Sequence, residues 1–357
     1  MVCQRGGQKN INGDGKDEPM QCVFKRLVKS MRKWISAALL VIAVAPATLI
    51  VFAGQLHGMQ HDLFSVYFLN ENDGWACGRW GTILYTSDGG TSWDNQKSNT
   101  DFTITDIHFV DSQNGWAVGD QGLIIHTKDG GITWESQKSP IISYLMAVQF
   151  VTPSKGWIVT ERTTILHTND GGSTWRVQFK DEDFILRSIS FCDEQNGWAV
   201  GEYGFVYHTT NGGKTWEQKA GTYELSLETM SMEGGNFLFD VIAIDPKTAW
   251  VVGIDGYVAR TEDGGKNWIK VVDGIPKRHL FGITSDSSGN IYICGDNALL
   301  GKSPGLSKFE NLKIASNITY GWLFRITPRG TKGLATVGKD GWIYTSNSAH
   351  NVWQKMR

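Results

Sequence analysis

Carboxylate side chains recur at one position of a turn that this chain repeats, with the pattern Ser/Thr-x-Asp-x-Gly-x-Thr-Trp or a close variant. Carboxylates that met at one point could bind calcium or serve as the acid and base of a hydrolase. Turns that belong to separate repeat units lie apart, however, and cannot converge on one site. A carboxylate or amide in this position also accepts N–H groups of its own turn, so we interpret these residues as structural. They are Asp88, Asp129, Asp170, Asn211 and Asp263.

Three histidines occupy a second shared position, immediately before the threonine that opens the turn: His126, His167 and His208. Three histidines suit zinc chemically, but zinc needs Zn–N distances of about 2.0–2.1 Å to all of them. Sheets that pack face to face lie about 10 Å apart, so histidines in the same place on successive sheets cannot reach one ion. The five cysteines contain no Cys-x-x-Cys pair either. We therefore expect no metal, no other cofactor and no catalytic residue.

Both patterns belong to a longer repeat that must position them. Its opening phrase, Gly-Trp-x-Val-Gly or a variant, returns after 41, 41, 41, 52, 42 and 43 residues. A period near 40 residues built from short strands predicts a β-propeller, and seven copies predict seven four-stranded blades. We therefore expect an all-β, seven-bladed propeller over residues 61–357, preceded by one N-terminal helix. The first aromatic position of the copies holds Trp75, Trp116, Trp157, Trp198, Trp250, Tyr292 and, in the last copy, Ala335.

The second copy shows how one blade is built. Its apolar pattern predicts strands over 105–110, 116–119 and 122–127. Asn114-Gly115 predicts a two-residue hairpin with positive φ at both residues. Because the first copy opens on a first strand and the last copy closes on a fourth, we expect no exchanged strand to close the ring. We expect the tryptophan that ends each aspartate turn to pack between blades, and apolar packing between blades 1 and 7 to close the ring.

The residues before the propeller differ from it in charge and hydropathy. Residues 1–34 carry eight Lys or Arg against three Asp or Glu, so the rest of the chain, whose total formal charge is −2, carries −7. An acidic propeller does not suit nucleic acid, which is bound by clustered basic residues. We expect residues 1–33 to be a disordered basic segment and the propeller to be monomeric.

Residues 34–54 contain no charged side chain, over a length sufficient to cross a bilayer. This segment is either an uncleaved transmembrane anchor, which we favour, or a signal peptide cut near Ala45-Pro46-Ala47. In both cases the basic cluster stays in the cytoplasm and the propeller is exported. We therefore expect the propeller in the periplasm or an equivalent lumen. It is tethered to the inner (cytoplasmic) membrane if the segment is an anchor, and free if a signal peptide is cleaved.

Similar aspartate turns also occur in sialidases and other glycosidases, which keeps an enzyme open as the alternative. A sialidase-like site would need an arginine cluster for the substrate carboxylate. The nearest match to that motif is Phe324-Arg325-Ile326-Thr327-Pro328, which lies in the last copy rather than ahead of the first turn. Because glycosidase carboxylates need no sequence signature, a sialidase-like glycosidase or a carbohydrate-binding propeller remains the second interpretation.

The aspartate turn is the Asp-box, and with the repeat Gly-Trp-x-Val-Gly…Thr-x-Asp-Gly-Gly-x-Thr-Trp it resembles the photosystem II stability/assembly factor family over the whole of 61–357. The resemblance implies a non-catalytic propeller that holds a membrane-protein subunit or complex. An arginine patch is implicated in the photosynthetic members, and only Arg260 matches a plausible patch position here. The repeat is also similar to one in exported bacterial proteins without a photosystem, so the implied role is assembly or stability rather than photosynthesis.

A partner is expected on the face that carries the turns between the second and third strands, which we call the tips. Their residue pairs differ between copies and together carry three positive and six negative side chains. Aromatic or His residues recur at the entry to the first strand in six copies, and apolar anchors among polar loops suit protein recognition. The alternative is that the aromatics plug the channel and the pairs are solvated turns. The predicted partner-binding residues are Arg79, Trp80, Asp120, Arg162, Glu202, Tyr203 and Asp255 in the tips, and Phe102, Tyr144, Phe184 and Trp322 at the strand entries.

The fourth and fifth copies are separated by 52 residues instead of about 41, which places about eleven extra residues within 220–239. Insertions on one face of a repeat array often mark its binding side. A merely lengthened hairpin is the alternative, and the sequence favours neither.

Overall fold

The computed structural model describes residues 61–226, 231–297, 300–303, 308–312 and 321–357. The predicted basic segment 1–33 and the predicted anchor or signal segment 34–54 lie outside these residues. Within the described part of the chain, no helix is both long and apolar enough to span a membrane.

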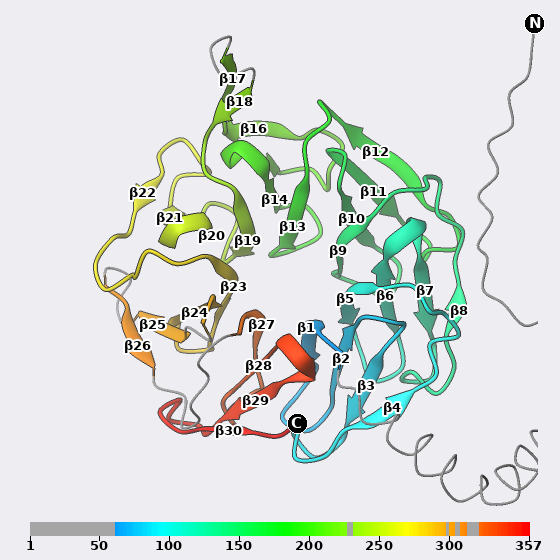
Figure 1. Cartoon of the computed structure of the whole chain (residues 1–357). Helices are drawn as coiled ribbons and strands as arrows, with labels where there is room; N and C mark the ends of the chain where they lie inside the picture. Colours follow the sequence, from blue (N-terminus) through cyan, green and yellow to red (C-terminus); the bar gives the residue numbers. More distant parts are fainter. Residues whose placement is uncertain (1–60, 227–230, 298–299, 304–307, 313–320) are drawn as a thin grey trace, which may run out of the picture. The chain divides into compact units, whose positions relative to one another are not determined.

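Seven four-stranded antiparallel sheets follow one another around a common centre, each built from four consecutive strands (Figure 1). The predicted seven-bladed propeller is therefore confirmed, and none of the described strands is exchanged to close the ring. Blade 1 contains β1 (Leu63–Phe68), β2 (Gly74–Gly78), β3 (Ile83–Thr86) and β4 (Asp94–Gln96). Blade 2 contains β5 (Ile104–Phe109), β6 (Gly115–Gly119), β7 (Ile124–Thr127) and β8 (Glu135–Ser136). Blade 3 contains β9 (Leu145–Phe150), β10 (Gly156–Thr160), β11 (Thr164–Thr168) and β12 (Arg176–Lys180).

The remaining blades repeat this order. Blade 4 contains β13 (Leu186–Phe191), β14 (Gly197–Gly201), β15 (Val206–Thr209) and β16 (Glu217–Ala220). Blade 5 contains β19 (Leu238–Ala243), β20 (Ala249–Gly253), β21 (Val258–Thr261) and β22 (Ile269–Lys270). Blade 6 contains β23 (Leu280–Ser285), β24 (Ile291–Gly295), β25 (Leu300–Ser303) and β26 (Glu310–Leu312). Blade 7 contains β27 (Leu323–Pro328), β28 (Leu334–Gly338), β29 (Ile343–Ser346) and β30 (Trp353–Lys355).

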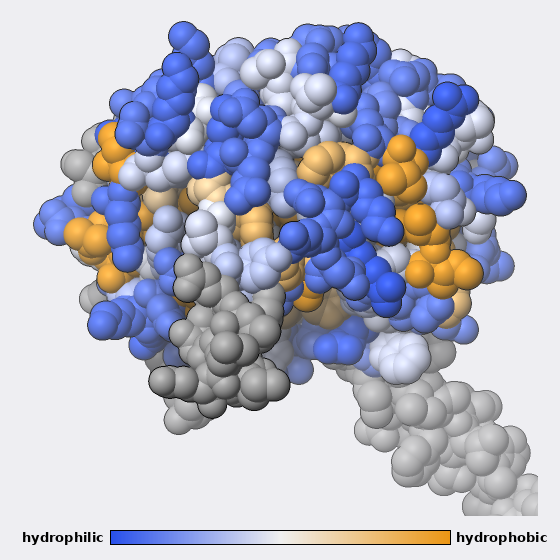
Figure 2. Space-filling model, turned by 90° about the horizontal axis from the view of Figure 1, so that it is seen from above, coloured by the Kyte–Doolittle hydropathy of each residue, from blue (hydrophilic) through white to orange (hydrophobic). Residues whose placement is uncertain are grey.

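Burial changes from the centre of each blade to its rim. The first strand lies innermost and carries a β-bulge at its second residue in all seven blades. The second strand is buried at every residue, as in β6 and β20. The fourth strand is mostly exposed, and an edge-on view shows hydrophilic side chains predominating, with apolar residues in separate patches (Figure 2).

Aromatic rings join each blade to the next. Trp75 on β2 stacks on Phe109 at the end of β5, with ring centroids 3.6 Å apart, and its indole N–H donates to the Gly130 carbonyl of blade 2. Trp116 and Phe150 repeat this contact between blades 2 and 3 at 3.5 Å. The tryptophan that ends the Asp-box meets the same Phe edge-on, as Trp134 meets Phe109. Trp134 also reaches the preceding blade, because its indole N–H donates to Gln96 Oε1 on β4 at 3.4 Å. The predicted packing of this tryptophan between blades is thus seen in the structure.

The predicted two-residue hairpin at Asn114-Gly115 is wrong. Neither residue has a positive φ, and the loop is wider, because the Val110 N–H donates to the Asn114 carbonyl. Asp111 Oδ1 holds this loop by accepting the N–H groups of Gln113 and Asn114. Glycine is required at 115 for a different reason: a Cβ there would lie 2.4 Å from the ring of Phe109.

Blades 7 and 1 close the ring by packing, as predicted. Leu63, Phe68 and Leu84 share one buried cluster with Val337 and Ile343. A buried arginine adds polar contacts to this closure. Arg329, which is 7% exposed, donates from its guanidinium to the carbonyls of Gly89 in blade 1 and Ser346 in blade 7.

The extra residues between the fourth and fifth copies form a separate hairpin between blades 4 and 5. Its strands are β17 (Tyr223–Ser226) and β18 (Ser231–Gly234), which pair only with each other (Figure 1). The short 3-10 turns of the propeller are η1 (Asp120–Gly122), η2 (Glu202–Gly204), η3 (Ile254–Gly256) and η4 (Lys339–Gly341), and each forms the tip of its blade. The β18 strand lies against η2, the tip of blade 4.

Candidate partner-binding face and channel mouth

Backbone hydrogen bonds separate two faces of the propeller. The first N–H of each tip donates to the carbonyl just before the first strand of its own blade: Arg79 to Asp62, Asp120 to Thr103, Glu161 to Tyr144, Glu202 to Ile185, Ile254 to Phe237, Asp296 to His279 and Lys339 to Trp322. The Asp-box glycines donate instead to the loops between the first and second strands, as Gly130 does to Gln113. The tips and the strand entries therefore share one face, which we call the mouth face.

The second residue of six tips has a positive φ, between 52° and 58°: Trp80, Gln121, Tyr203, Asp255, Asn297 and Asp340. In five of these tips a glycine with positive φ follows, so the tight turn needs no particular side chain at its apex. Trp80 is 66% exposed, and Phe102 beside it, whose carbonyl accepts the Gly81 N–H, is 48% exposed. These two predicted residues form an exposed apolar pair on the mouth face.

Other predicted partner residues are engaged within the protein. Phe184 and Tyr203 contact each other at 5.1 Å between ring centroids, and Tyr223 of the inserted hairpin contacts Phe184 at 4.7 Å. Glu202 accepts the N–H of Ile185, and Arg79 pairs with Asp62 at 3.0 Å. These residues hold the mouth face together, so less of each side chain is free for a partner.

The remaining predicted residues have varied surroundings. Asp255 lies 3.6 Å from His279, and Lys339 lies over the ring of Trp322 at 5.4 Å. Tyr144 lines the cavity described next. Asp120 accepts the N–H of Gln121, and Arg162 is exposed. The structure thus brings the predicted residues to one face but distributes them around its circumference.

The centre of this face contains a cavity that the sequence analysis did not identify. It has a volume of about 140 Å³ and is lined by the bulged second residues of the innermost strands. Aromatic rings follow one another along one side of it, which we call the aromatic arc: Phe239 to Phe281 at 5.0 Å, Phe281 to Phe324 at 5.6 Å and Phe324 to Phe64 at 5.2 Å. Phe237, just before β19, contacts Phe239 at 4.9 Å. The sequence does contain a pattern that could have predicted this arc: phenylalanine is the second residue of the first strand in four blades, as Phe64, Phe239, Phe281 and Phe324.

Below the arc, the third residues of the first strands form a polar belt, consisting of Ser65, Asp106, Ser188, Asp240 and Arg325. Arg325 Nη1 donates to Asp240 Oδ1 at 3.0 Å, and the same oxygen accepts the Ser188 hydroxyl at 2.6 Å. Asp240 Oδ2 accepts the N–H of Ile283. One carboxylate therefore joins blades 4, 5, 6 and 7. Arg325, the nearest match to a sialidase arginine, is held in this ion pair.

The second carboxylate of the belt has no comparable cation. Asp106 accepts the Ser65 hydroxyl at 2.6 Å and the Val148 N–H at 2.9 Å, which links blades 1, 2 and 3. Burial raises the pKa of Asp106, although Arg325 and the hydrogen bonds act against that increase. Burial alone would lower the pKa of Arg325, but the charges of Asp240 and Asp106 raise it above its ordinary value.

The Asp-box carboxylates lie away from this centre and are satisfied locally. Asp170 Oδ1 accepts the N–H of Thr174 and the hydroxyl of Thr168, and its other oxygen accepts the Thr174 hydroxyl. These bonds, the one from the Thr174 hydroxyl first, lower the pKa of Asp170 to about 2. Asn211 accepts the equivalent N–H of Thr215, so the turn does not need a charge.

The three repeat histidines are likewise held within their own blades. His126 stacks on Trp116 at 4.4 Å, His167 on Trp157 at 4.9 Å and His208 on Trp198 at 3.8 Å. Burial lowers the pKa of His126 to about 4, so the imidazole is neutral at pH 7. Among the described residues, no three His, Cys, Asp or Glu side chains gather closely enough to hold a metal ion. Arg260 takes the histidine position in blade 5, where it lies over Trp250 and pairs with Glu262.

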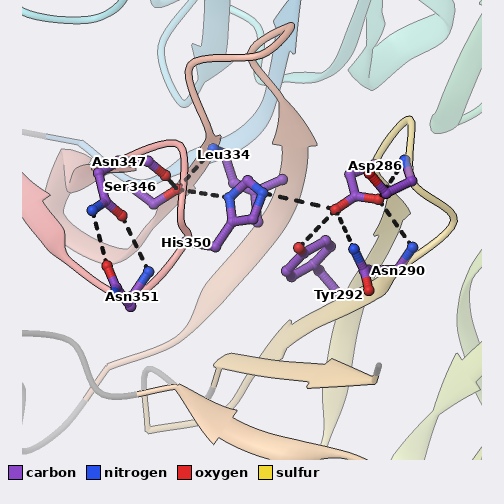
Figure 3. Close-up of polar contacts among 9 residues, drawn as sticks. Asp286, Asn290, Tyr292, Leu334, Ser346, Asn347, His350 and Asn351 are labelled. Carbon is purple, nitrogen blue, oxygen red and sulfur yellow. Dashed lines mark hydrogen bonds and ion pairs between the residues drawn. The ribbon is translucent and has the colours of Figure 1, made fainter. Parts of the chain in front are cut away.

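A serine, a histidine and an aspartate also meet between blades 6 and 7 (Figure 3). Ser346 Oγ lies 3.4 Å from His350 Nδ1, and His350 Nε2 lies 3.8 Å from Asp286. The arrangement does not suit nucleophilic catalysis, because Ser346 is 3% exposed, donates to the Asn347 carbonyl and accepts the Leu334 N–H. It replaces the Asp-box of the last blade and ties that turn to blade 6.

Comparison with known proteins agrees with this architecture. A family described as photosynthesis system II assembly factor YCF48 matches residues 55–138 and 133–226. One similar solved structure is a YCF48 bound to a D1 peptide, which is 17% identical, with 80% of this chain and 91% of that chain covered and a TM-score of 0.65. Another is the YCF48 of Cyanidioschyzon merolae, which is 16% identical, with 80% of this chain and 95% of that chain covered and a TM-score of 0.64. No curated protein sequence matches the chain.

An enzyme also has this fold. The GH74 enzyme of Niastella koreensis is 14% identical over 83% of this chain, with a TM-score of 0.66, but only 54% of that enzyme is covered. At such identity the likeness is one of fold alone. The chain is a seven-bladed propeller, and its repeat and the family match over residues 55–226 make it similar to the photosystem II assembly factors.

Proposed function

We propose that this chain is a non-catalytic assembly or stability factor that binds a segment of a membrane-protein subunit on its mouth face. The observation that carries the proposal is the contrast between the two faces. The Asp-box face repeats one self-satisfied turn, whereas the mouth face combines variable tips, the exposed pair Trp80 and Phe102, and the aromatic arc. Exposed aromatic side chains near a polar rim are typical of protein-binding surfaces.

The size of the central cavity favours a polypeptide segment over a sugar chain. Its volume of about 140 Å³ is below the roughly 300–1,000 Å³ of ordinary small-molecule sites. A single side chain or chain end fits such a space, with the rest of the segment lying across the tips. The similar YCF48 structure that holds a D1 peptide supports a peptide ligand for this type of propeller.

We also propose that residues 34–54 tether the propeller to the membrane, with residues 61–357 exported as a monomer. The support is in the sequence: a basic segment at 25–33 precedes a stretch without charge. Alkaline extraction of membranes, followed by N-terminal sequencing, tests this. A soluble mature chain that begins near residue 48 would contradict the anchor and support the signal peptide.

Site-directed cross-linking tests the main proposal. A photoreactive residue is introduced at Trp80, at Phe102 or, as the matched control, at Ile132, which is 79% exposed in an Asp-box. The full-length protein is expressed in its source organism and newly made proteins are pulse-labelled. We expect cross-links from positions 80 and 102, but not 132, to one newly made membrane-protein subunit, declining during the chase. Equal cross-linking from position 132, or no membrane protein at all, would refute the proposal.

A further inference from the structure

The cavity at the channel mouth contains a cation that has no partner. Arg187 is the second residue of β13 and lines the cavity, with its guanidinium over the ring of Phe239 at 5.9 Å. Its Nε is buried without a hydrogen-bond partner, and among the described residues the guanidinium forms no hydrogen bond or ion pair. Arginine stays protonated in proteins, so this group is a half-buried positive charge. Such a charge is costly unless an anion accompanies it.

The acids of the belt do not supply that anion. Asp240 is occupied by Arg325, Ser188 and Ile283, and Asp106 by Ser65 and Val148. Arg187 interacts with Asp240 and Tyr144 only at longer range. The two arginines of the cavity therefore differ: one is neutralised within the protein, and the other is available to a ligand.

The remaining wall indicates what such a ligand carries besides its charge. Phe64, Phe239, Phe281, Phe324 and Met146 line the same cavity as Arg187. We infer that the channel mouth is a subsite for a carboxylate attached to a short apolar or aromatic group, with Arg187 binding the carboxylate and the aromatic arc packing against the apolar part. A planar guanidinium suits a carboxylate because two parallel N–H groups can meet its two oxygens. The inference rests on the proposed function in one respect, that the partner protein presents this group.

The test uses a small probe, so it does not depend on knowing the partner. Binding of 3-phenylpropionate and of its neutral amide to the full-length protein is measured by calorimetry or by NMR titration. We expect the acid to bind at least tenfold more tightly than the amide. Arg187→Met should remove this preference, Arg187→Lys should keep part of it, and Arg176→Met, on the exposed strand β12, should leave it unchanged.

Equal binding of acid and amide to the wild-type protein overturns the inference, and so does a preference that survives in Arg187→Met. The wild-type comparison decides the question even where a variant fails to fold. Two peptides then separate the sources of the carboxylate: one has an internal glutamate beside phenylalanine and an amidated end, and the other has a free C-terminal phenylalanine. Binding of either above its neutral counterpart supports the subsite, and binding of neither contradicts it.

This outcome is independent of the proposed function. Cross-linking from Trp80 and Phe102 without any preference for the acid would overturn the subsite and leave the binding function intact. A preference for the acid without cross-linking to a membrane protein would leave the subsite and refute the function.

Discussion

Arg325 on β27 and Asp240 on β19 lie 85 residues apart in sequence and form a hydrogen-bonded ion pair 3.0 Å long at the centre of the propeller. Asp240 is 2% exposed, whereas 34% of the Arg325 side chain is open to the channel. The pair joins blades 5 and 7 across blade 6. No repeat position predicts it, because the third residue of the first strand differs from blade to blade.

Arg325→Met should destabilise the propeller, because it leaves the buried carboxylate of Asp240 without its cation. We expect a loss of about 2–4 kcal/mol in the free energy of unfolding, measured by urea denaturation. Asp240→Asn added to this variant should recover part of the loss, since the amide needs no counter-charge. Strictly additive effects would mean that the two side chains do not stabilise each other.

Gly115→Ala and Gly264→Ala should both destabilise, for different reasons. At position 115 the new Cβ would lie 2.4 Å from the Phe109 ring, and displacing that ring costs about 1–3 kcal/mol. At position 264 no atom lies within 4 Å, but φ is +75°, which costs about 1–2 kcal/mol for a residue with a Cβ. Because Phe109 stacks on Trp75, only Gly115→Ala should change the tryptophan fluorescence. The same spectral change in both variants would contradict the steric explanation.

His126→Phe should reduce the pH dependence of stability between about pH 6.5 and pH 4. Burial lowers the pKa of His126 to about 4 in the folded protein, so the unfolded chain takes up the proton first as the pH falls. The histidine's contribution is therefore complete above pH 6.5 and declines towards pH 4. Phenylalanine can keep the stacking on Trp116 without titrating. Urea denaturation at a series of pH values should show a flatter profile for the variant, and an unchanged profile would refute this assignment.

Asp170→Asn should also reduce the pH dependence of stability, but in a lower pH range. The pKa of Asp170 is about 2, below the ordinary 3.8, so its contribution is present above about pH 4 and is lost as the pH falls through 2. The natural Asn211 shows that an amide accepts the same bonds, so the variant should remain folded. Between pH 4 and pH 2 its unfolding free energy should fall less than that of the wild type. An equal fall would show that other carboxyl groups dominate acid unfolding.

Trp80→Ala and Tyr203→Ala separate surface from framework within the predicted partner residues. Trp80 is 66% exposed, so its removal should change the free energy of unfolding by less than about 0.5 kcal/mol while weakening partner binding. Tyr203 packs against Phe184, so its removal should cost about 1–2 kcal/mol. Calorimetric unfolding of both variants, with cross-linking from Phe102 as the binding assay, measures both effects. A destabilised Trp80→Ala would show that this tip is framework rather than binding surface.

The sequence predicted the parts of this protein that repeat. The 41-residue spacing and the Asp-box predicted the number of blades and the packing of the Trp134-type ring, because each blade needs the same local contacts. The Asn114-Gly115 prediction failed because a short turn signal was considered without the ring of Phe109, which excludes a side chain at 115. Binding by the predicted tip residues remains a prediction.

By itself, the sequence determined the fold, the Asp-box turns and the separation of varied tips from uniform turns, because those depend on contacts within a blade or between adjacent blades. Only the tertiary structure showed that Phe184 and Tyr203 are covered by Tyr223, that Arg325 is paired and that Arg187 is not. The surroundings of the two arginines depend on residues of other blades around the propeller centre, Asp240 for Arg325 and Phe239 for Arg187. No spacing along the chain records them, because they form only when all seven first strands meet.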